Sequence, residues 1–485
     1  MRLDAPRMLL VLTFAASLVV NALPVFRPVL VGDDVEIVVR SWTWRRTRAT
    51  LWEPQNEHAM PLGRLSTRGL VILAGRPTLL PLLTALQGPI AQLTAIGLLY
   101  VFVRRELNDP NLAALATAIF GVTSLYHQAI SWFAASFSLL ALDTMLLALL
   151  AAQSWVHTSR CWWLVACTIG TMLSPAWFAS GVLAGPLCAM YLLLGNVRKV
   201  EELGAEGWWR VRRLDFLAPP LGTVLFAASL PPSTVEHVMH LEHYEGRSAT
   251  DAFHFGTGTW YTARSLVDNL CLGQLGVSGV RCPNWLVPFA LVIIGAAALV
   301  WWGRAPHRRL LALGLGFIFG TYLLVYSARA EWDYDWADFS TPTWGRYHLL
   351  PQLGLALFVV GGIRPGFVLD RRRLRIAAFF LVAACIVHFP RVVAQHCYRE
   401  PGARPFGIRL IDPAEQQAVL VRVEELDARC LEFSIDAETA RAALGRQTLP
   451  LCSDKENVLD LLRGSDKPRQ ISVDEARRLL DSGRD

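Results

Sequence analysis

Charged residues are scarce in this chain. Asp, Glu, Lys and Arg make up 18% of the 485 residues, whereas hydrophobic residues make up 53%. Average soluble domains have a higher charged fraction, about 25%. The composition therefore excludes an ordinary soluble protein and indicates a chain that uses a lipid bilayer as its solvent.

Several signatures of chemistry are also missing. The sequence has no glycine-rich phosphate-binding loop, no convincing Ser/His/Asp arrangement and no repeat of solenoid period. An ATP-driven engine is therefore not expected within this chain. The formal net charge is +6, but Lys and Arg fall in short clusters between apolar runs. Because they do not form one contiguous face, nucleic acid is not an expected partner.

Long apolar runs are abundant instead. A helix rises about 1.5 Å per residue, so roughly 20 apolar residues are needed to cross about 30 Å of hydrocarbon. The sequence predicts an all-α polytopic membrane protein with about eleven transmembrane helices. The first run leads to Gly32 without a clear cleavage site, which favours a retained span over a signal peptide. The predicted spans are residues 8–26, 79–103, 112–126, 133–153, 162–175, 178–194, 216–230, 286–302, 310–326, 349–362 and 376–389.

Basic clusters predict the orientation. With a cytoplasmic amino terminus, five loops rich in Arg or Lys become cytoplasmic, as the positive-inside rule requires. The first outer loop is an exception, because arginines stand at positions 40, 45, 46 and 48. Residues 69–78 are interpreted as lying along or dipping into the outer membrane surface. We therefore expect a multi-pass protein of the inner cell membrane. The five loops contain residues 104–105, 157–160, 198–213, 304–309 and 364–375.

The chain divides into two parts. Residues 1–390 are the predicted transmembrane domain, and residues 391–485 form a polar tail of mixed charge on the extracytoplasmic side. In the tail, Asp412 and Glu415 have the spacing of a helix N-cap and its third residue, and two further capping boxes begin at Ser453 and Ser472. The sequence therefore predicts a small helical appendage. The predicted outer loops of the first part are residues 30–78, 231–283 and 331–348.

Two adjacent carboxylates, Asp33 and Asp34, follow the first span directly. Like charges close together near hydrocarbon make one of the pair a stronger base, which suits general-base catalysis. In the alternative interpretation, the pair marks the water interface and caps the next helix. Composition alone leaves both interpretations open.

Two further motifs follow the pair. The first is Asn56-Glu57-His58-x-x-Pro61-Leu62-x-Arg64-Leu65, and the second is Tyr126-His127-Gln128-Ala129-Ile130-Ser131-Trp132. With the acidic pair, they make this chain resemble the GT-C superfamily of integral membrane glycosyltransferases. That superfamily includes protein O-mannosyltransferases and lipid A aminoarabinose transferases, and the first motif is similar to a segment of uncharacterised bacterial members. The likeness covers roughly the first third of the chain well. The family's frequent Asp-Glu pair is Asp33-Asp34 here.

This resemblance implies an activity. The donor is a sugar on a polyprenyl phosphate in the outer leaflet, and the sugar passes, with inversion, to an acceptor hydroxyl of a lipid, glycan or protein. A carboxylate must take the proton of the attacking hydroxyl. Asp34 is the first choice for that base and Asp33 the second. No metal ligand is assigned, and whether a divalent metal takes part is left open.

The remaining candidates hold the two substrates. The leaving phosphate carries negative charge, so cationic and hydroxyl donors at the membrane surface should stabilise it. Arg346, Tyr347 and Arg64 are the candidates for this role. In the alternative interpretation, Arg346 extends to lipid headgroups and Tyr347 belongs to an aromatic belt. The residues expected to bind substrate elsewhere are Glu57, His58, His127 and Trp132.

Other features favour different interpretations. His237, His240 and His243 recur at a spacing of three, which fits a solvated helix face better than a metal site. Asp143 lies inside a predicted span, where it should face the bundle interior as a buried hydrogen-bond partner. Such an intramembrane acid also fits a transporter or flippase of lipid-linked substrates. A third hypothesis is a GT-C-like scaffold without catalysis.

Overall fold

The computed structural model describes ten stretches of the chain and five short strands. The stretches are residues 4–26, 33–55, 58–74, 79–195, 215–239, 255–274, 283–304, 307–329, 345–363 and 367–397. The strands are β1 (Phe406–Leu410), β2 (Ala418–Arg422), β3 (Cys430–Ser434), β4 (Thr448–Leu451) and β5 (Arg469–Ile471).

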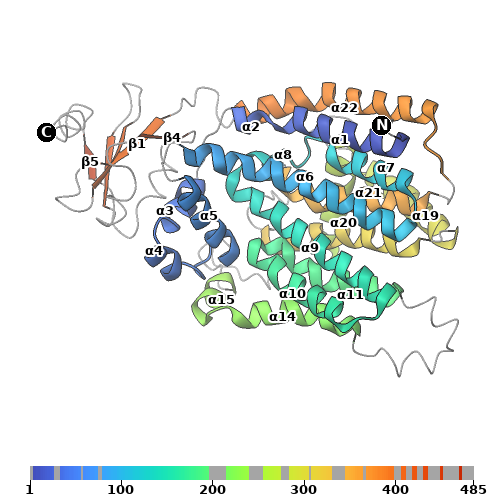
Figure 1. Ribbon diagram of the computed structural model, residues 1–485, viewed down its shortest axis with the longest axis horizontal. Coiled ribbons are helices and arrows are strands. Elements are labelled where there is room, and N and C mark those ends of the chain that lie inside the picture. Colours follow the sequence, from blue (N-terminus) through green and yellow to red (C-terminus); the bar gives the residue numbers. More distant parts are fainter. Residues whose placement is uncertain are drawn as a thin grey trace.

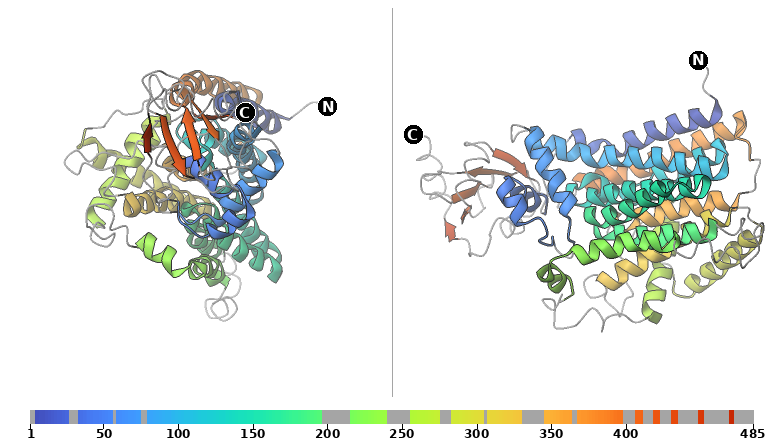
Figure 2. Two further views of the ribbon diagram at one scale, coloured as in Figure 1. Left: turned by 90° about the vertical axis from the view of Figure 1, so that its left-hand side faces the viewer. Right: turned by 60° about the horizontal axis from the view of Figure 1, so that its bottom comes forward.

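Long helices run side by side and form the body of the molecule (Figures 1 and 2). Their facing sides build one large apolar core, in which Leu99, Phe102, Leu142 and Leu313 are fully buried. The helices are α1 (Ala5–Asn21), α6 (Leu80–Leu107), α7 (Pro110–Gly121), α9 (Phe133–Thr158), α10 (Cys161–Trp177), α11 (Ala184–Gly195), α14 (Ala218–Ser229), α19 (Leu286–Arg304), α20 (Arg308–Arg329), α21 (Leu349–Gly362) and α22 (Arg371–Cys397).

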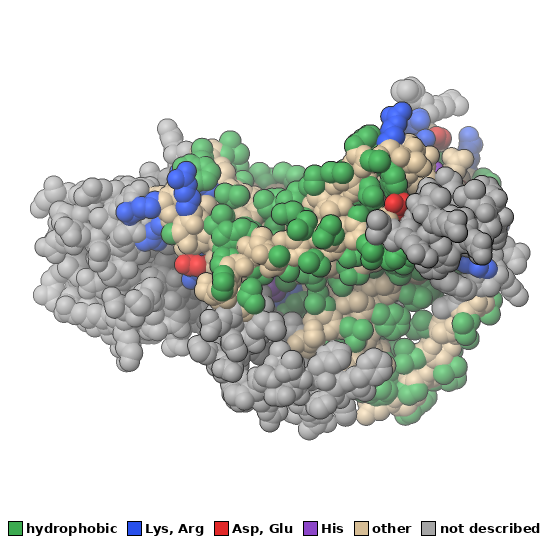
Figure 3. Space-filling view, turned by 90° about the horizontal axis from the view of Figure 1, so that it is seen from below, with side chains coloured by type: hydrophobic (Ala, Val, Ile, Leu, Met, Phe, Trp, Pro, Cys, Tyr) green, Lys and Arg blue, Asp and Glu red, His purple; other side chains and the backbone are tan. Residues whose placement is uncertain are grey.

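Four helices in the described part of the chain are long and apolar enough to cross a membrane. They are α6 over Leu82–Leu107, α9 over Phe133–Thr158, α20 over Arg308–Ser327 and α22 over Arg371–Pro390. In Figure 3, hydrophobic side chains cover the middle of the molecule, and Lys and Arg side chains gather toward its two ends. An apolar band between charged ends suits hydrocarbon between two aqueous faces. The chain is therefore a helical membrane protein.

Each of the predicted spans overlaps a helix. The agreement is closest for α21, which covers the predicted residues 349–362, whereas α7 stops at Gly121 before the predicted end at Tyr126. Helix length and composition qualify four described helices for a full crossing, and other apolar helices are shorter. The count of about eleven spans therefore stays a prediction.

The two ends of the bundle differ in character. Short helices gather at one end, and the amino terminus lies at the other (Figure 1). At the amino-terminal end, the last turn of α6 carries Arg104 and Arg105. Glu106 of the same turn forms an ion pair of 3.4 Å with Arg309 at the start of α20. Basic helix ends thus lie away from the predicted outer loops. The short helices at the opposite end are α3 (Asp33–Arg40), α4 (Trp44–Ala49), α5 (Pro61–Ala74) and α15 (Pro232–Met239).

Shorter elements connect these parts. The chain passes from α7 to α9 through α8 (His127–Ser131), which packs tightly on α6. A Cβ atom at Gly88 of α6 would lie only 1.9 Å from the carbonyl oxygen of Ile130 in α8. Glycine is therefore what allows the two backbones to approach. The other connecting elements are α2 (Leu23–Phe26), η2 (Ala179–Leu183), η3 (Asp215–Leu217), α17 (Phe255–Arg264), the π-helix η4 (Ser265–Cys271), α18 (Leu272–Gln274) and η5 (Gly345–His348).

The tail corrects one expectation. Its described residues form a five-stranded antiparallel sheet in the order β4-β1-β2-β3-β5, where we predicted a helical appendage. The physical reason is visible in β1, where Phe406, Ile408 and Leu410 alternate with other residues at the period of a strand. The helix signals at Asp412 and Ser453 lie between strands, the one at Ser472 follows β5, and all three begin outside the described residues.

Candidate functional site

The outer-loop helix α3 places a carboxylate against the start of α9. Asp34 is 1% exposed, and its Oδ1 accepts a hydrogen bond from the backbone amide of Ala134 at 2.8 Å. Ala134 lies in the first turn of α9, where backbone amides have no partner within the helix and the helix dipole favours negative charge. The contact therefore fixes α3 on α9 and suits an ionised side chain.

Arg346, which is more than three hundred positions after Asp34 in the chain, contacts the same end of α9. The guanidinium of Arg346 lies 4.8 Å from the ring centroid of Trp132, the N-cap residue of α9, and 5.0 Å from that of Tyr347. Its Nη2 also donates a hydrogen bond of 3.2 Å to the hydroxyl of Tyr347. Two aromatic faces and a hydroxyl thus orient this cation. Four predicted site residues are brought to one helix end: Asp34, Trp132, Arg346 and Tyr347.

The helix α8 completes this region. His127 is buried, and its Nδ1 lies 3.2 Å from the side-chain oxygen of Asn21 at the end of α1. Gln128 accepts a hydrogen bond of 3.4 Å from the backbone amide of Arg346. Neither Asn21 nor Gln128 was predicted as a site residue. The signal for Gln128 was its position inside the motif that contains His127 and Trp132.

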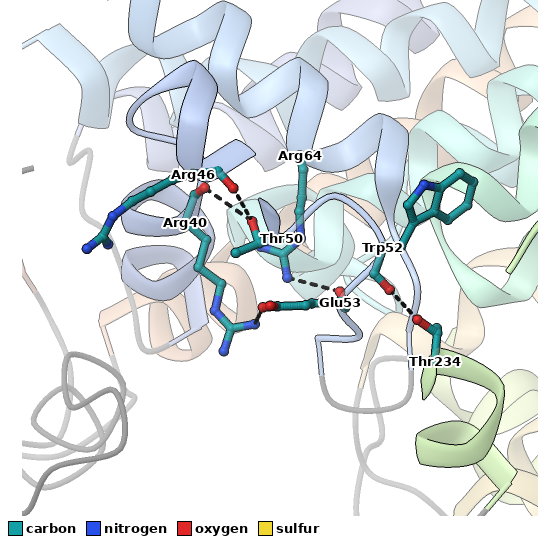
Figure 4. A network of polar contacts seen from close by, with 7 residues as sticks. All are labelled: Arg40, Arg46, Thr50, Trp52, Glu53, Arg64 and Thr234. Carbon is teal, nitrogen blue, oxygen red and sulfur yellow. Dashed lines mark hydrogen bonds and ion pairs between the residues drawn. The ribbon is translucent and has the colours of Figure 1, made fainter. Parts of the chain in front are cut away.

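A separate network supports the first outer loop (Figure 4). Arg64 is buried, and its Nη2 donates a hydrogen bond of 3.1 Å to the carbonyl oxygen of Glu53. The side chain of Glu53 forms an ion pair of 3.2 Å with Arg40. Nearby, the hydroxyl of Thr234 in α15 donates a hydrogen bond of 2.8 Å to the carbonyl oxygen of Trp52. These contacts make Arg64 a support of the loop, and its role in phosphate binding stays a prediction.

Other predicted residues lie apart or outside the description. The half-buried ring of His58 packs against Phe178, with 4.3 Å between the ring centroids, at the junction of α10 and η2. Glu57 lies outside the described residues, and the side chain of Asp33 is not described. Two of the repeated histidines, His240 and His243, also fall outside the described ranges. Among the residues that are described, no three His, Cys, Asp or Glu side chains are grouped to hold a metal ion.

One acid lies deep in the bundle. Asp143 of α9 is 8% exposed, which confirms the expectation that it faces the interior. Its Oδ1 is buried and has no hydrogen-bond partner among the described residues, so the expected hydrogen bond is not made by this oxygen. A buried polar atom without a partner is costly in a membrane helix. Asp143 is therefore a second place to look for function.

The start of α9 combines the parts that a transfer reaction with a charged leaving group needs. A carboxylate can accept a proton, and a fixed guanidinium can stabilise a developing phosphate charge. They contact positions 134 and 132 of one helix, and they come from chain segments far apart in sequence. No protein-family model matches this chain, and no curated protein sequence matches it.

Proposed function

We propose that this chain is a membrane glycosyltransferase of the GT-C type. It transfers a sugar with inversion from a polyprenyl-phosphate donor to an acceptor hydroxyl on the extracytoplasmic face. The single observation that carries the proposal is that Asp34 and Arg346 both contact the start of α9, Asp34 at Ala134 and Arg346 at Trp132. The resemblance of the acidic pair and of the two motifs to that superfamily gives independent support.

In the proposed reaction, Asp34 is the general base. The acceptor oxygen attacks the anomeric carbon of the sugar, its proton passes to the carboxylate, and the bond between the sugar and the phosphate oxygen breaks. In the structure, Oδ1 of this carboxylate accepts a hydrogen bond from the amide of Ala134. Because the side chain is 1% exposed, α3 has to move on α9 when the acceptor enters.

Arg346 and Tyr347 stabilise the leaving polyprenyl phosphate. A guanidinium can donate two parallel hydrogen bonds to phosphate, and its position over the Trp132 ring keeps it oriented before the reaction. A cation that is already in place needs little reorganisation when charge develops. His127, His58 and Glu57 are proposed to hold the substrates, and Arg64 acts on the phosphate indirectly by supporting the first outer loop.

The proposal includes an orientation. About eleven helices cross the inner membrane, the amino terminus is cytoplasmic, and α3, α4, α5 and the tail are extracytoplasmic. The gathering of these elements at one end of the bundle supports this arrangement (Figure 2). The basic turn around Arg104 and Arg105 at the other end supports it too. The bilayer then presents the donor laterally to the outer end.

The experiment uses Asp34→Asn in cells that carry the variant in place of the natural gene. Asparagine keeps the oxygen that accepts the Ala134 amide, so the fold is preserved while the base is lost. We expect the lipid-linked sugar donor to accumulate in lipid extracts measured by mass spectrometry, as in cells lacking the gene. The matched control is Asp109→Asn, which alters another helix cap, on α7. Normal donor levels in the Asp34→Asn cells would remove this residue from the mechanism.

A second candidate function is a GT-C-like scaffold without catalysis. The nearly complete burial of Asp34 favours it, because a helix cap alone accounts for that contact. The two candidates differ in one comparison. If Asp34→Ala lowers the amount of folded protein and Asp34→Asn changes neither folding nor donor levels, the scaffold explains the site.

A transporter or flippase is the third candidate, and Asp143 is the observation that favours it. A buried carboxylate in a membrane helix is a recurrent part of proton-coupled transport. In that case, Asp143→Asn should abolish movement of the lipid-linked substrate while Asp34→Asn has no effect. Loss of sugar transfer with Asp34→Asn alone favours the enzyme.

A further inference from the structure

The helix α5 turns an apolar stripe outward at the outer end of the bundle. Its exposed residues are Leu65, Gly69, Ile72 and Leu73, and they follow the spacing of one helix face. Leu73 is 70% exposed and Ile72 is 53% exposed. An exposed apolar face on a helix whose other face is already packed indicates a surface that binds something apolar.

Cationic and aromatic side chains border this stripe. The guanidinium of Arg68, on α5 itself, lies 5.6 Å from the ring centroid of Trp44 on α4. Trp44 is 48% exposed, and Arg45 and Arg48 of the same helix are exposed as well. One arm of Arg68 donates to the carbonyl oxygen of Trp42. Trp44 thus contacts the cation of α5 and lies on the helix that carries the exposed Arg45 and Arg48.

The fold holds this surface at the edge of the membrane. The helix α5 ends at Ala74, and α6 begins at Leu80, two residues before its membrane-length segment Leu82–Leu107. Leu79, just before α6, is 47% exposed. The stripe on α5 is therefore close to the level at which the hydrocarbon begins. Amphipathic helices with Arg and Trp at their polar edge lie at this level of a bilayer.

We propose that the surface formed by Trp44, Arg45, Arg48, Arg68 and the apolar stripe of α5 binds an anionic phospholipid. The acyl chains lie along Leu65, Ile72 and Leu73. The three arginines hold the phosphate and the net negative headgroup, and the Trp44 ring lies at the boundary between them. This site also explains two of the four arginines that depart from the positive-inside rule, Arg45 and Arg48, because they bind lipid instead of reporting topology. The inference does not depend on sugar transfer.

A photo-crosslinking experiment tests the site with the full chain in nanodiscs. Two probes carry the same diazirine-labelled acyl chain, one on phosphatidylglycerol and one on phosphatidylcholine. Mass spectrometry locates the crosslinked peptides. One surface arginine favours an anionic over a zwitterionic headgroup by about fivefold. We therefore expect crosslinks within residues 44–73 to be about fivefold or more enriched for phosphatidylglycerol.

Variants make the test specific. Arg45→Gln with Arg48→Gln should reduce the phosphatidylglycerol crosslinks in residues 44–73 toward the phosphatidylcholine level, and adding Arg68→Gln should remove the preference. The matched control, Arg371→Gln with Arg372→Gln, removes the same charge from exposed positions at the start of α22 and should change nothing in this segment. Equal crosslinking of both probes to the natural chain overturns the proposal. Absence of crosslinks within residues 44–73 also overturns it and points to a protein partner.

Discussion

The carboxylate of Asp34 and the backbone amide of Ala134 are 2.8 Å apart, although one hundred positions separate them in the chain. This contact predicts different outcomes for two substitutions. Asp34→Ala leaves a buried amide without an acceptor and should lower the free energy of unfolding by about 1–3 kcal/mol. Asp34→Asn keeps the acceptor and should change it by less than about 0.5 kcal/mol. Thermal unfolding of the detergent-solubilised protein measures both, and equal losses would contradict the assigned contact.

The pair formed by Arg346 and Trp132 should contribute measurable coupling energy. A desolvated cation over an indole ring is worth about 2 kcal/mol, and an exposed one about 0.5–1 kcal/mol. We expect the double-mutant cycle of Arg346→Gln and Trp132→Leu to give about 1–2 kcal/mol of coupling, since both side chains are at least partly buried. Arg346→Lys tests the geometry, because it keeps the charge and loses the planar group. Strictly additive single effects would show that the two side chains act independently.

Two glycines of α6 should respond in opposite ways to alanine. Gly88→Ala places a Cβ atom against the carbonyl oxygen of Ile130, so it should displace α8 and reduce both stability and any activity at the start of α9. Among the described residues, no atom lies within 4 Å of a Cβ atom added at Gly97. Gly97→Ala should therefore be neutral or stabilise the helix by up to about 1 kcal/mol. Melting temperatures of the two variants, measured side by side, make the comparison.

Two glutamates at opposite ends of the bundle form ion pairs that differ in burial. Glu106 accepts hydrogen bonds from Gln153 and Tyr191 and pairs with Arg309, whereas Glu53 pairs with the partly exposed Arg40. Removing one partner of a buried pair costs about 3–5 kcal/mol, and an exposed pair is worth about 0–1 kcal/mol. We expect Glu106→Ala to destabilise the protein strongly and Glu53→Ala to have little effect on the unfolding midpoint. Similar midpoints for both variants would be the contrary result.

Replacing Asp143 by an apolar residue is expected to increase stability. Its Oδ1 has no hydrogen-bond partner in the part of the chain that the structure describes, so Asp143→Leu removes an unpaired polar group from the bundle. If the side chain has no functional role, the substitution should raise the free energy of unfolding by about 1–3 kcal/mol and leave activity unchanged. A loss of transport or transfer in a stable Asp143→Leu protein would instead give this acid a function.

The helical part of the fold was predictable because membrane helices are long apolar runs, which hydropathy detects directly. Runs of apolar residues identified the segments that became α1, α6, α9 and α21, and the structure shifts mainly their ends. Helix ends depend on local contacts instead. The early end of α7 at Gly121 coincides with a place where an added Cβ atom would meet Ile96 at 2.9 Å. Hydropathy carries no information about such a contact.

The prediction of a helical tail was wrong for the described residues of the tail, and the reason is a different one. Capping boxes are short and frequent in polar sequence, whereas the alternation in β1 and the apolar run in β2 each fall within only five residues. The prediction of a helical tail rested on the capping boxes. Pairing between strands stabilises segments that are too short to be convincing alone. The partner of each strand, such as β4 beside β1, is a long-range property that a single sequence does not reveal.

The site was predictable as a list of residues and not as an arrangement. A motif pointed to His127 and Trp132, and the need for a cation at the membrane surface pointed to Arg346, but nothing in the sequence joined Asp34 to α9. The network around Arg64 shows the opposite case, because a conspicuous cation turned out to hold a backbone carbonyl in the first loop. Burial decides between such roles, and burial depends on elements that are distant in sequence.

The contacts at the start of α9 determine how Asp34 and Arg346 can move relative to each other. The acid from α3 contacts the first turn of α9, and the cation from η5 contacts its N-cap residue, so a movement of α3 that admits an acceptor also changes the spacing between the two groups. A rearrangement elsewhere that leaves α3 seated on α9 leaves this spacing unchanged. The position of α3 relative to α9 would therefore govern when the two groups are presented together.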